Sequence, residues 1–323
     1  MNPAVTRVLR PAAIAIAALL TVLLVAVIAV FTWPLDADGL HPAPRKLSFA
    51  DARARIAERA AAERADSGIL PECRSLSLVH DDAPAARSVL MLHGFTDCPV
   101  QFAQLAQSFH DQGYNVYVPL APRHGHATRD ALGGLRAKEL AEYASDALDV
   151  TVALGAEAGV VGLSGGGMLA TRLTTERPDD VRRLLTISPF YRPAPAQAAP
   201  ITIRPLVVLY GFRLLPDHVD DKNMSYTALA QYIRLSETMD TARTGGNLTS
   251  IAVVTSADDD LIDMGRAASI PRTIAGARNL PLTTHEFPAA SGLGHDPVDP
   301  NDIGPAKNDL YKLYLALYEG RPA

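Results

Sequence analysis

The sequence has 323 residues, of which 48% are hydrophobic and 20% are charged, and its formal net charge is −5. An acidic balance without any basic run argues against a nucleic-acid partner. Cys73 and Cys98 are the only cysteines, which excludes a metal cluster built on cysteine ligands. No internal repeat is visible, so a solenoid is not expected.

The first apolar stretch is long enough to cross a membrane. Residues 11–31 carry no charge and match the roughly 20 residues that a helix needs to span a bilayer. Arg7 and Arg10 precede the stretch and Asp36 follows it, so the positive-inside rule places the N-terminus in the cytosol and the rest of the chain outside. We therefore predict an uncleaved signal anchor over residues 1–34. A cleaved signal peptide is the alternative.

Residues 35–70 are predicted to form a linker and a surface helix. Two prolines and a glycine between residues 35 and 46 favour an irregular connection. Ser48 and Asp51 then resemble a capping box for a helix from residue 49 to about 65. Its arginines and glutamates indicate a solvated helix.

From residue 71 to the C-terminus, apolar strands alternate with amphipathic helices. Continuous apolar runs such as residues 88–92 are typical of strands buried on both faces. This alternation predicts an α/β fold with a mostly parallel, doubly wound sheet. Besides the strand that leads to Gly162, strands are expected at residues 76–79, 88–92, 114–119, 181–187, 251–255 and 282–287. Helices are expected after Pro99 and at residues 137–154, 264–275 and 305–318.

The alternation is interrupted between about residues 191 and 247, where we predict a mostly helical cap insertion. The interruption begins with several prolines and continues with an apolar segment, residues 201–212, and a helical stretch, residues 226–239. The apolar segment is more hydrophobic than an exposed lid requires. We favour packing within the cap's own core, while lining of an acyl-chain pocket and contact with the membrane stay open.

The motif Gly162-Leu163-Ser164-Gly165-Gly166 fits G-x-S-x-G and lies between an apolar run and a helical segment. In that context Ser164 is expected on a sharp turn from strand to helix, where its hydroxyl can act as a nucleophile. The N–H of Gly165, at the start of the helix, would point toward the oxyanion position.

A serine nucleophile needs a histidine base and an acid that orients it. His295 lies on a glycine-rich loop after the last predicted strand. The other histidines beyond Ser164 are His218, in the cap, and His285, within a strand. Several aspartates follow the strand at 251–255, and only one of them is needed to face the base, so the residues alone leave the acid open.

The loop that begins with His93-Gly94-Phe95 follows an earlier strand. Its Phe95 backbone N–H is the expected second oxyanion donor. The imidazole of His93 is interpreted as a structural group that hydrogen-bonds its own loop. His124 and His126 lie two residues apart on a loop, which is only a weak signal for a metal site. We interpret them as part of a loop that packs over the nucleophile.

Taken as a set, these motifs resemble the α/β-hydrolase superfamily, and within it the bacterial carboxylesterase and monoacylglycerol-lipase-like group. The matching segments are Leu92-His93-Gly94-Phe95-Thr96, Tyr114 to Pro119 followed by Arg123-His124-Gly125-His126, the Ser164 motif, and Gly294-His295-Asp296. The resemblance spans residue 75 to the end of the chain. In the group's acid motif, Val253-Val254 through Leu261-Ile262 places the catalytic aspartate at Asp259, with Asp258 as the alternative.

The sequence therefore predicts a membrane-anchored serine hydrolase for carboxylic esters of small or lipid alcohols. Its catalytic domain, residues 71–323, is expected on the periplasmic side of a bacterial inner membrane, and neither a metal nor an organic cofactor is expected. An acyltransferase or thioesterase with the same triad and a non-catalytic binding domain are the alternatives. In an extracytoplasmic domain, Cys73 and Cys98 could form a disulfide.

Overall fold

A seven-stranded sheet forms the centre of the protein, whose computed structural model describes residues 3–321 apart from 38, 129 and 222–223. The strand order is β1-β3-β2-β4-β5-β6-β7. Only the edge strand β1 is antiparallel to its neighbour, and the other pairs are parallel. The strands are β1 (Leu76–Leu78), β2 (Ala85–Leu92), β3 (Tyr114–Val118), β4 (Gly155–Leu163), β5 (Arg183–Ile187), β6 (Ser250–Ser256) and β7 (Leu282–Phe287).

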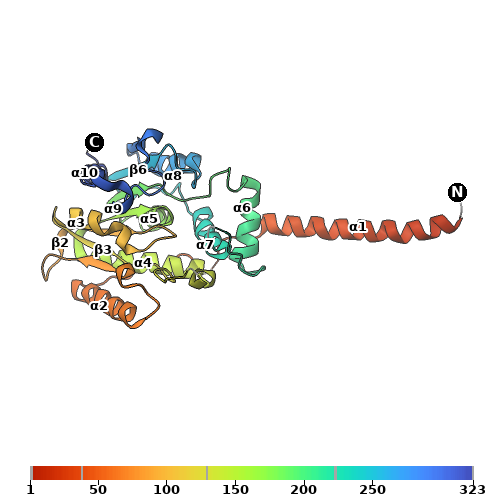
Figure 1. The fold of residues 1–323 in the computed structure, drawn as a ribbon, viewed down its shortest axis with the longest axis horizontal. Coiled ribbons are helices and arrows are strands. Elements are labelled where there is room, and N and C mark those ends of the chain that lie inside the picture. Colours follow the sequence, from red (N-terminus) through yellow and green to blue (C-terminus); the bar gives the residue numbers. More distant parts are fainter. Residues whose placement is uncertain (1–2, 38, 129, 222–223, 322–323) are drawn as a thin grey trace.

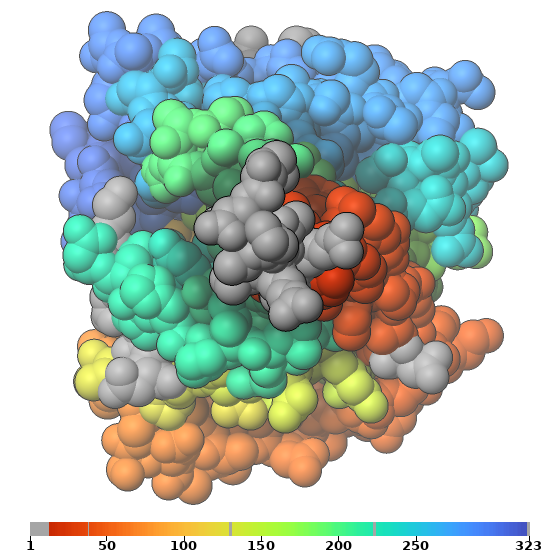
Figure 2. All heavy atoms as spheres, turned by 90° about the vertical axis from the view of Figure 1, so that its right-hand side faces the viewer, coloured from red at the N-terminus to blue at the C-terminus, as the bar shows by residue number. Residues whose placement is uncertain are grey.

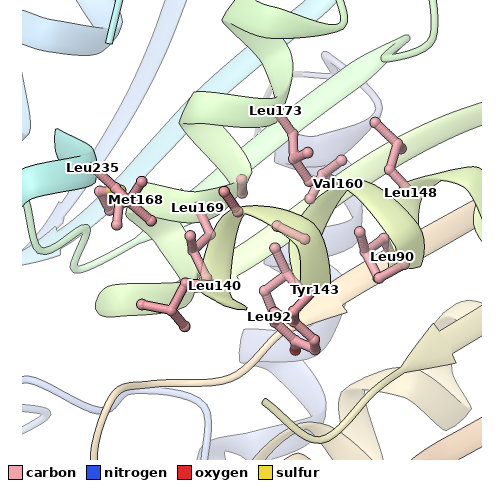
Figure 3. Packing of buried hydrophobic residues seen from close by; sticks show 14 of the residues in the cluster. Leu90, Leu92, Leu140, Tyr143, Leu148, Val160, Met168, Leu169, Leu173 and Leu235 are labelled. Atoms are coloured by element: carbon pink, nitrogen blue, oxygen red, sulfur yellow. The ribbon is translucent and has the colours of Figure 1, made fainter. Parts of the chain in front are cut away.

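Helices cover both faces of the sheet. Along β2, Val89 and Met91 pack on one face, while Leu90 and Leu92 pack on the other, as the two-residue period of a strand requires. The first face is covered by α3 (Ala103–His110) and α10 (Lys307–Tyr318). The second is covered by α4 (Ala137–Leu154), α5 (Gly165–Glu176) and α8 (Met264–Ala277), as Figure 3 shows in part. This arrangement confirms the predicted doubly wound α/β fold.

Two helices precede the sheet. The first, α1 (Pro3–Thr32), projects away from the body (Figure 1). Among the described residues, its part Ala13–Thr32 is the one helix long and apolar enough to cross a membrane. The second, α2 (Phe49–Ala65), begins with the predicted capping box, in which the Asp51 N–H donates to Ser48 Oγ and the Ser48 N–H donates to Asp51 Oδ2.

The named elements in the segment between β5 and β6 are all helical, but they cover less than half of the predicted cap, and the rest of its described residues are turns and irregular chain. These elements are α6 (Pro200–Leu206), a π-helical turn η4 (Val207–Gly211) and α7 (Tyr226–Glu237). Ile203, Val207 and Val208 are buried with Ile233 of α7 and with Leu35, so this part of the apolar segment packs as core, whereas Leu206 lines a cavity. Ile201, at the start of the same segment, is exposed.

Short helical turns begin or separate several of the longer elements. The helix predicted after Pro99 opens as a 3₁₀ turn before α3, and the helix expected from residue 305 begins only at Lys307 because a 3₁₀ turn precedes it. These short elements are η1 (Pro71–Cys73), η2 (Pro99–Phe102), η3 (Asp130–Gly134), η5 (Ala289–Ser291), α9 (Pro300–Ile303) and η6 (Gly304–Ala306).

Candidate active site

Ser164 lies on the turn between β4 and α5, with a backbone conformation that residues other than glycine rarely adopt. Its φ and ψ are 52° and −119°. The turn is held by the Ser164 N–H, which donates to the Ile187 carbonyl (3.0 Å), and by the Phe190 N–H, which donates to the Ser164 carbonyl (2.9 Å). Such strain persists only where the surrounding structure enforces it, and it is common at functional sites.

Two glycines of the motif permit this turn because the neighbouring backbone leaves no room for a side chain at either position. A Cβ at Gly166 would lie 1.9 Å from the Leu92 carbonyl oxygen, and a Cβ at Gly162 would lie 2.3 Å from the Gly166 carbonyl oxygen. Neither glycine has a positive φ, so the requirement is close approach of the backbone. The end of β2, the end of β4 and the start of α5 can therefore meet at Ser164.

The structure pairs His295 with Asp259. His295 Nδ1 lies 2.8 Å from Asp259 Oδ2, and the Asp259 side chain is fully buried, with its second oxygen accepting from the Leu261 N–H. Because the carboxylate accepts the Nδ1 proton, Nε2 is left as the basic nitrogen. Asp258 instead accepts from Ser256 Oγ (2.5 Å) at the surface. Between the two predicted acids, the structure thus places Asp259 and not Asp258 against the imidazole.

Ser164 and His295 line the same cavity, which has a volume of about 420 Å³. The His295 side chain is 20% exposed and follows Gly292 and Gly294, both of which have a positive φ. Most of the remaining wall is apolar and comes from the segment between β5 and β6 and from the loop after β2. It includes Phe95, Phe190, Leu206 and Leu229, and Leu261 after β6 completes this apolar part.

The two predicted oxyanion donors are neighbours at this cavity. A Cβ built on Gly165 would lie 3.2 Å from the Phe95 Cβ, so the loop after β2 directly contacts the start of α5. His124 supports the loop from behind, since its Nε2 lies 2.8 Å from the Phe95 carbonyl oxygen and its Nδ1 lies 2.8 Å from the Pro122 carbonyl oxygen. His124 therefore belongs to the packing around the loop.

The His93 imidazole has a structural role, as the sequence indicated. Its Nδ1 donates to the Gly94 carbonyl (2.9 Å), and its Nε2 accepts from the Ala121 N–H (3.0 Å). Burial, followed by repulsion from His124, lowers the pKa of His93 to about 3. The ring is therefore neutral at pH 7 and holds two loops together.

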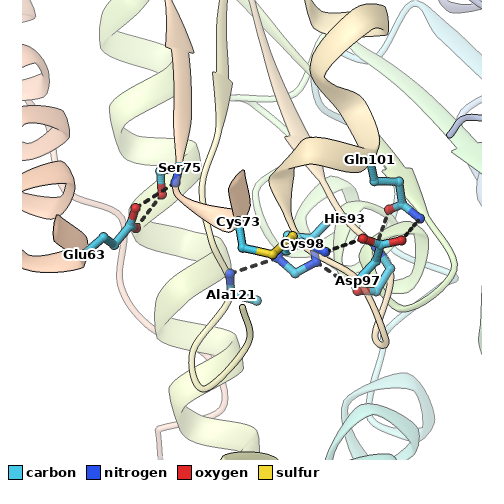
Figure 4. Close-up of a disulfide and its surroundings, with 9 residues drawn as sticks. Glu63, Cys73, Ser75, His93, Asp97, Cys98, Gln101 and Ala121 are labelled. Atoms are coloured by element: carbon cyan, nitrogen blue, oxygen red, sulfur yellow. Dashed lines mark hydrogen bonds between the residues drawn. A yellow bond between two sulfur atoms is a disulfide. The ribbon is translucent and has the colours of Figure 1, made fainter. Parts of the chain in front are cut away.

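Gln101, which no sequence motif singled out, connects the oxyanion loop to the loop of His295, and Figure 4 shows it beside Asp97. Its Oε1 accepts from the Gly94 N–H (2.9 Å), and its Nε2 donates to Asp97 (3.2 Å) and to Asp296 (2.5 Å). The side chain is buried. No local pattern marks this residue, because its two partners lie on loops that only the tertiary fold brings together.

Three carboxylates next to Gln101 are the one group among the described residues with the spacing of metal ligands. Oxygens of Asp97, Asp296 and Asp299 lie within 4.8 Å of one another. Each carboxylate has internal partners: the Cys98 N–H donates to Asp97, the Val298 N–H to Asp296 and the Asn301 N–H to Asp299. These backbone hydrogen bonds explain why the three carboxylates lie close together, and we assign no metal to them.

We expect the free energy of unfolding to depend on pH through Asp97, and the substitution Asp97→Asn to remove this dependence. Burial and the nearby carboxylates raise the pKa of Asp97 from 3.8 to about 6, so the folded protein binds an additional proton between these pH values. The free energy of unfolding therefore falls as the pH rises from about 4 to about 6, because ionising Asp97 costs more in the folded than in the unfolded protein. We expect Asp97→Asn to gain stability over the wild type across this window, by at most about 3 kcal/mol. Urea unfolding of both proteins between pH 4 and 8 measures it, and a difference independent of pH would contradict it.

A disulfide joins Cys73 of η1 to Cys98, at the end of the oxyanion loop (Figure 4). It closes a loop with a sequence separation of 25, for which chain entropy predicts a stabilisation of ~3.5 kcal/mol. We expect the double variant Cys73→Ser, Cys98→Ser to lose about this free energy of unfolding. Reductant should destabilise the wild type similarly and leave the double variant unchanged. An equal response of the two proteins to reductant would refute the expectation.

The sheet order, the strained serine turn and the buried acid–imidazole pair give the chain the α/β-hydrolase fold. Residues 83–232 match a hydrolase family model described as serine aminopeptidase, S33. No protein of curated function matches the sequence.

Solved structures of lipolytic enzymes share the fold at low sequence identity. One, from a study of the metagenome-derived lipolytic enzymes LipS and LipT, is 17% identical over 78% of this chain and 100% of its own, with a TM-score of 0.56. The monoacylglycerol lipase of Paleococcus ferrophilus is 14% identical over 76% of this chain and 98% of its own, with a TM-score of 0.57. A soluble variant of monoglyceride lipase from Saccharomyces cerevisiae is 11% identical over 76% and 91%, with a TM-score of 0.50.

Proposed function

We propose that the protein is a membrane-anchored serine hydrolase that cleaves carboxylic esters through an acyl-enzyme. The observation that carries the proposal is the convergence of Ser164 and the Asp259-paired His295 on one apolar cavity. No metal or organic cofactor is needed for this chemistry.

In the proposed mechanism, Ser164 Oγ attacks the ester carbonyl carbon while His295 Nε2 takes the hydroxyl proton. Asp259 holds the imidazole in the required tautomer and stabilises its protonated form. The N–H groups of Phe95 and Gly165 stabilise the negative charge on the carbonyl oxygen. His295 then gives the proton to the leaving alcohol. Water repeats the sequence on the acyl-enzyme and releases the carboxylic acid.

The substrate class follows from the wall of the cavity. Its side chains near Ser164 are mainly apolar, which suits the acyl chain of a lipid or of a small hydrophobic ester. The similarity in fold to lipolytic enzymes supports the same substrate class. We assign residues 71–323 to the hydrolase domain and the segment of about 191–247 to its cap.

The anchor and the compartment are part of the proposal. The apolar helix Ala13–Thr32 has the length and composition of a membrane span, and Arg7 and Arg10 before it favour a cytosolic N-terminus. The Cys73–Cys98 disulfide suits an oxidising compartment such as the periplasm. We therefore place the hydrolase domain on the periplasmic side of a bacterial inner membrane, behind a linker and surface helix over residues 35–70.

A fluorophosphonate probe tests the nucleophile directly. The probe phosphonylates an activated serine, so we expect the wild-type protein to be labelled and Ser164→Ala to remain unlabelled. Intact mass and thermal unfolding of both proteins confirm that the variant is folded. Labelling of a folded Ser164→Ala protein, or none of the wild type, would overturn the proposed function.

A further inference from the structure

Several large apolar side chains of the segment between β5 and β6 are exposed. Within the segment between β5 and β6, Ile201 is 67% and Leu214 is 53% exposed, and Leu215 and Val219 are exposed as well. We call these four residues the cap surface. Outside α1 and the cap surface, the described chain exposes only three large apolar side chains, Trp33, Val100 and Leu261. An apolar surface of this kind usually marks a contact with a partner.

The cap surface lies next to the point where α1 leaves the body. Val30, near the end of α1, packs with Leu35 against Ile203 of α6 and its buried neighbours. The Trp33 ring meets the Phe212 ring edge-on, with centroids 5.8 Å apart. Viewed along α1, segments from between β5 and β6 flank the helix (Figures 1 and 2).

Polar bonds fix the end of α1 to the same segment. Arg204 of α6 donates to the Trp33 carbonyl, and Arg234 of α7 donates to the Leu35 carbonyl. A helix that ends at Thr32 in a membrane therefore holds α6 and α7 at the membrane surface. The tryptophan would lie at the depth where aromatic residues concentrate at membrane interfaces.

Two charged residues of the loop that carries Leu214 and Leu215 form hydrogen bonds within the fold. Arg213 donates to the carbonyl oxygens of Gly133 and Leu135. The Asp217 carboxylate accepts from Ser225 Oγ and from the Thr227 N–H. These bonds shape the loop while Leu214 and Leu215 stay exposed between them.

The catalytic cavity shares a wall with this region. Phe190, Leu206 and Leu229 line the cavity with Ser164 and His295, and the same three residues pack against the small core that holds Leu35 and contacts Val30. Apolar residues therefore connect the region around the end of α1 with the wall of the catalytic cavity.

We propose that the cap surface rests in the headgroup region of the bilayer that α1 spans, and that the cavity takes the acyl chain of a membrane lipid ester from this leaflet. The apolar contact is of the kind that holds interfacial segments in place. The substrate class in this inference rests on the proposed function, whereas the contact with the bilayer does not.

Site-specific quenching tests the contact. Because Cys73 and Cys98 are bonded to each other, full-length Leu214→Cys offers a single free thiol for a fluorophore. The matched control is Ala61→Cys, an exposed position on α2. Figure 1 shows α2 away from α1. Both proteins are reconstituted into phosphatidylcholine vesicles that contain nitroxide-labelled lipid. Trp33, the only tryptophan, reports insertion of α1 through its quenching by brominated lipid.

We expect strong quenching at position 214 and little at position 61, with Trp33 quenched in both proteins. Equal quenching at 214 and 61 while Trp33 is quenched would overturn the inference and leave the anchor intact. An unquenched Trp33 would overturn both the inference and the anchor. A second copy or a protein partner on the cap surface would shield position 214 from lipid and would therefore also count against the proposal.

A pair of esters tests the delivery of substrate. The double variant Ile201→Asp, Leu214→Asp and the control Ala61→Asp are compared with the wild type in vesicles. One substrate is 1-oleoylglycerol in the bilayer, and the other is water-soluble 4-nitrophenyl acetate. We expect the double variant to lose about tenfold activity on the bilayer ester and to retain the wild-type rate on the soluble ester. Wild-type rates on both esters would overturn the inference, whereas a wild-type protein inactive on both would overturn the proposed function.

Discussion

Asp259→Asn is expected to lower kcat for ester hydrolysis about 10⁴-fold at pH 7, as the loss of the orienting carboxylate does in serine proteases. The amide can still accept from the Leu261 N–H, so the fold should be retained. It can, however, present an N–H to His295 Nδ1, which favours the tautomer whose Nε2 carries a proton and cannot act as a base. Steady-state kinetics with a soluble ester, together with thermal unfolding, measure both effects.

Asp258→Asn is the matched control, because the two aspartates are adjacent and only their contacts differ. The Asp258 carboxylate accepts from Ser256 Oγ at the surface and has no described contact with His295. We expect kcat to stay within about threefold of the wild type, as for a surface change away from the reacting groups. Equal losses in the two variants, or a larger loss for Asp258→Asn, would show that the assignment of the acid is wrong.

The strands were predictable because burial on both faces leaves a strong signal in the sequence. The apolar run at residues 88–92 alternates between two cores, and each of its side chains is buried. The capping box at Ser48 and the end of α4 at Leu154 follow from rules that act over three or four residues. Such local signals also gave the order of the serine, acid and base segments along the chain.

Contacts between distant loops were not predictable in the same way. Gln101 connects Gly94 to Asp296, nearly 200 residues away in the chain, and nothing near Gln101 in the sequence indicates a residue of this kind. His124 was interpreted as loop packing, but its partner, the Phe95 carbonyl on a distant loop, was not indicated by the sequence. The acid was open on the residues alone because Asp258 and Asp259 share one turn, and the backbone of that turn decides which carboxylate is buried.

Gly166→Ala is expected to cause the largest loss of stability of any single methyl addition in the motif. The new Cβ would lie 1.9 Å from the Leu92 carbonyl oxygen and 2.6 Å from that of His93, both of which are backbone atoms. A flexible side chain cannot move aside to relieve this overlap, so β2 or α5 must shift. We expect a loss of more than about 4 kcal/mol in the free energy of unfolding, or no folded protein. Urea unfolding, or the yield of soluble protein, measures it.

Gly276→Ala supplies the comparison that separates this clash from the general effect of glycine in a helix. Gly276 lies in α8, and a Cβ there would meet no atom within 4 Å. Alanine should therefore stabilise the protein by up to about 1 kcal/mol through helix propensity alone. Opposite signs for the two substitutions would locate the cost at Gly166 in the contact between α5 and the oxyanion loop, which is the contact that brings Ser164 to the cavity. A mild effect of Gly166→Ala would show that this contact can relax, and the strained turn would then need another explanation.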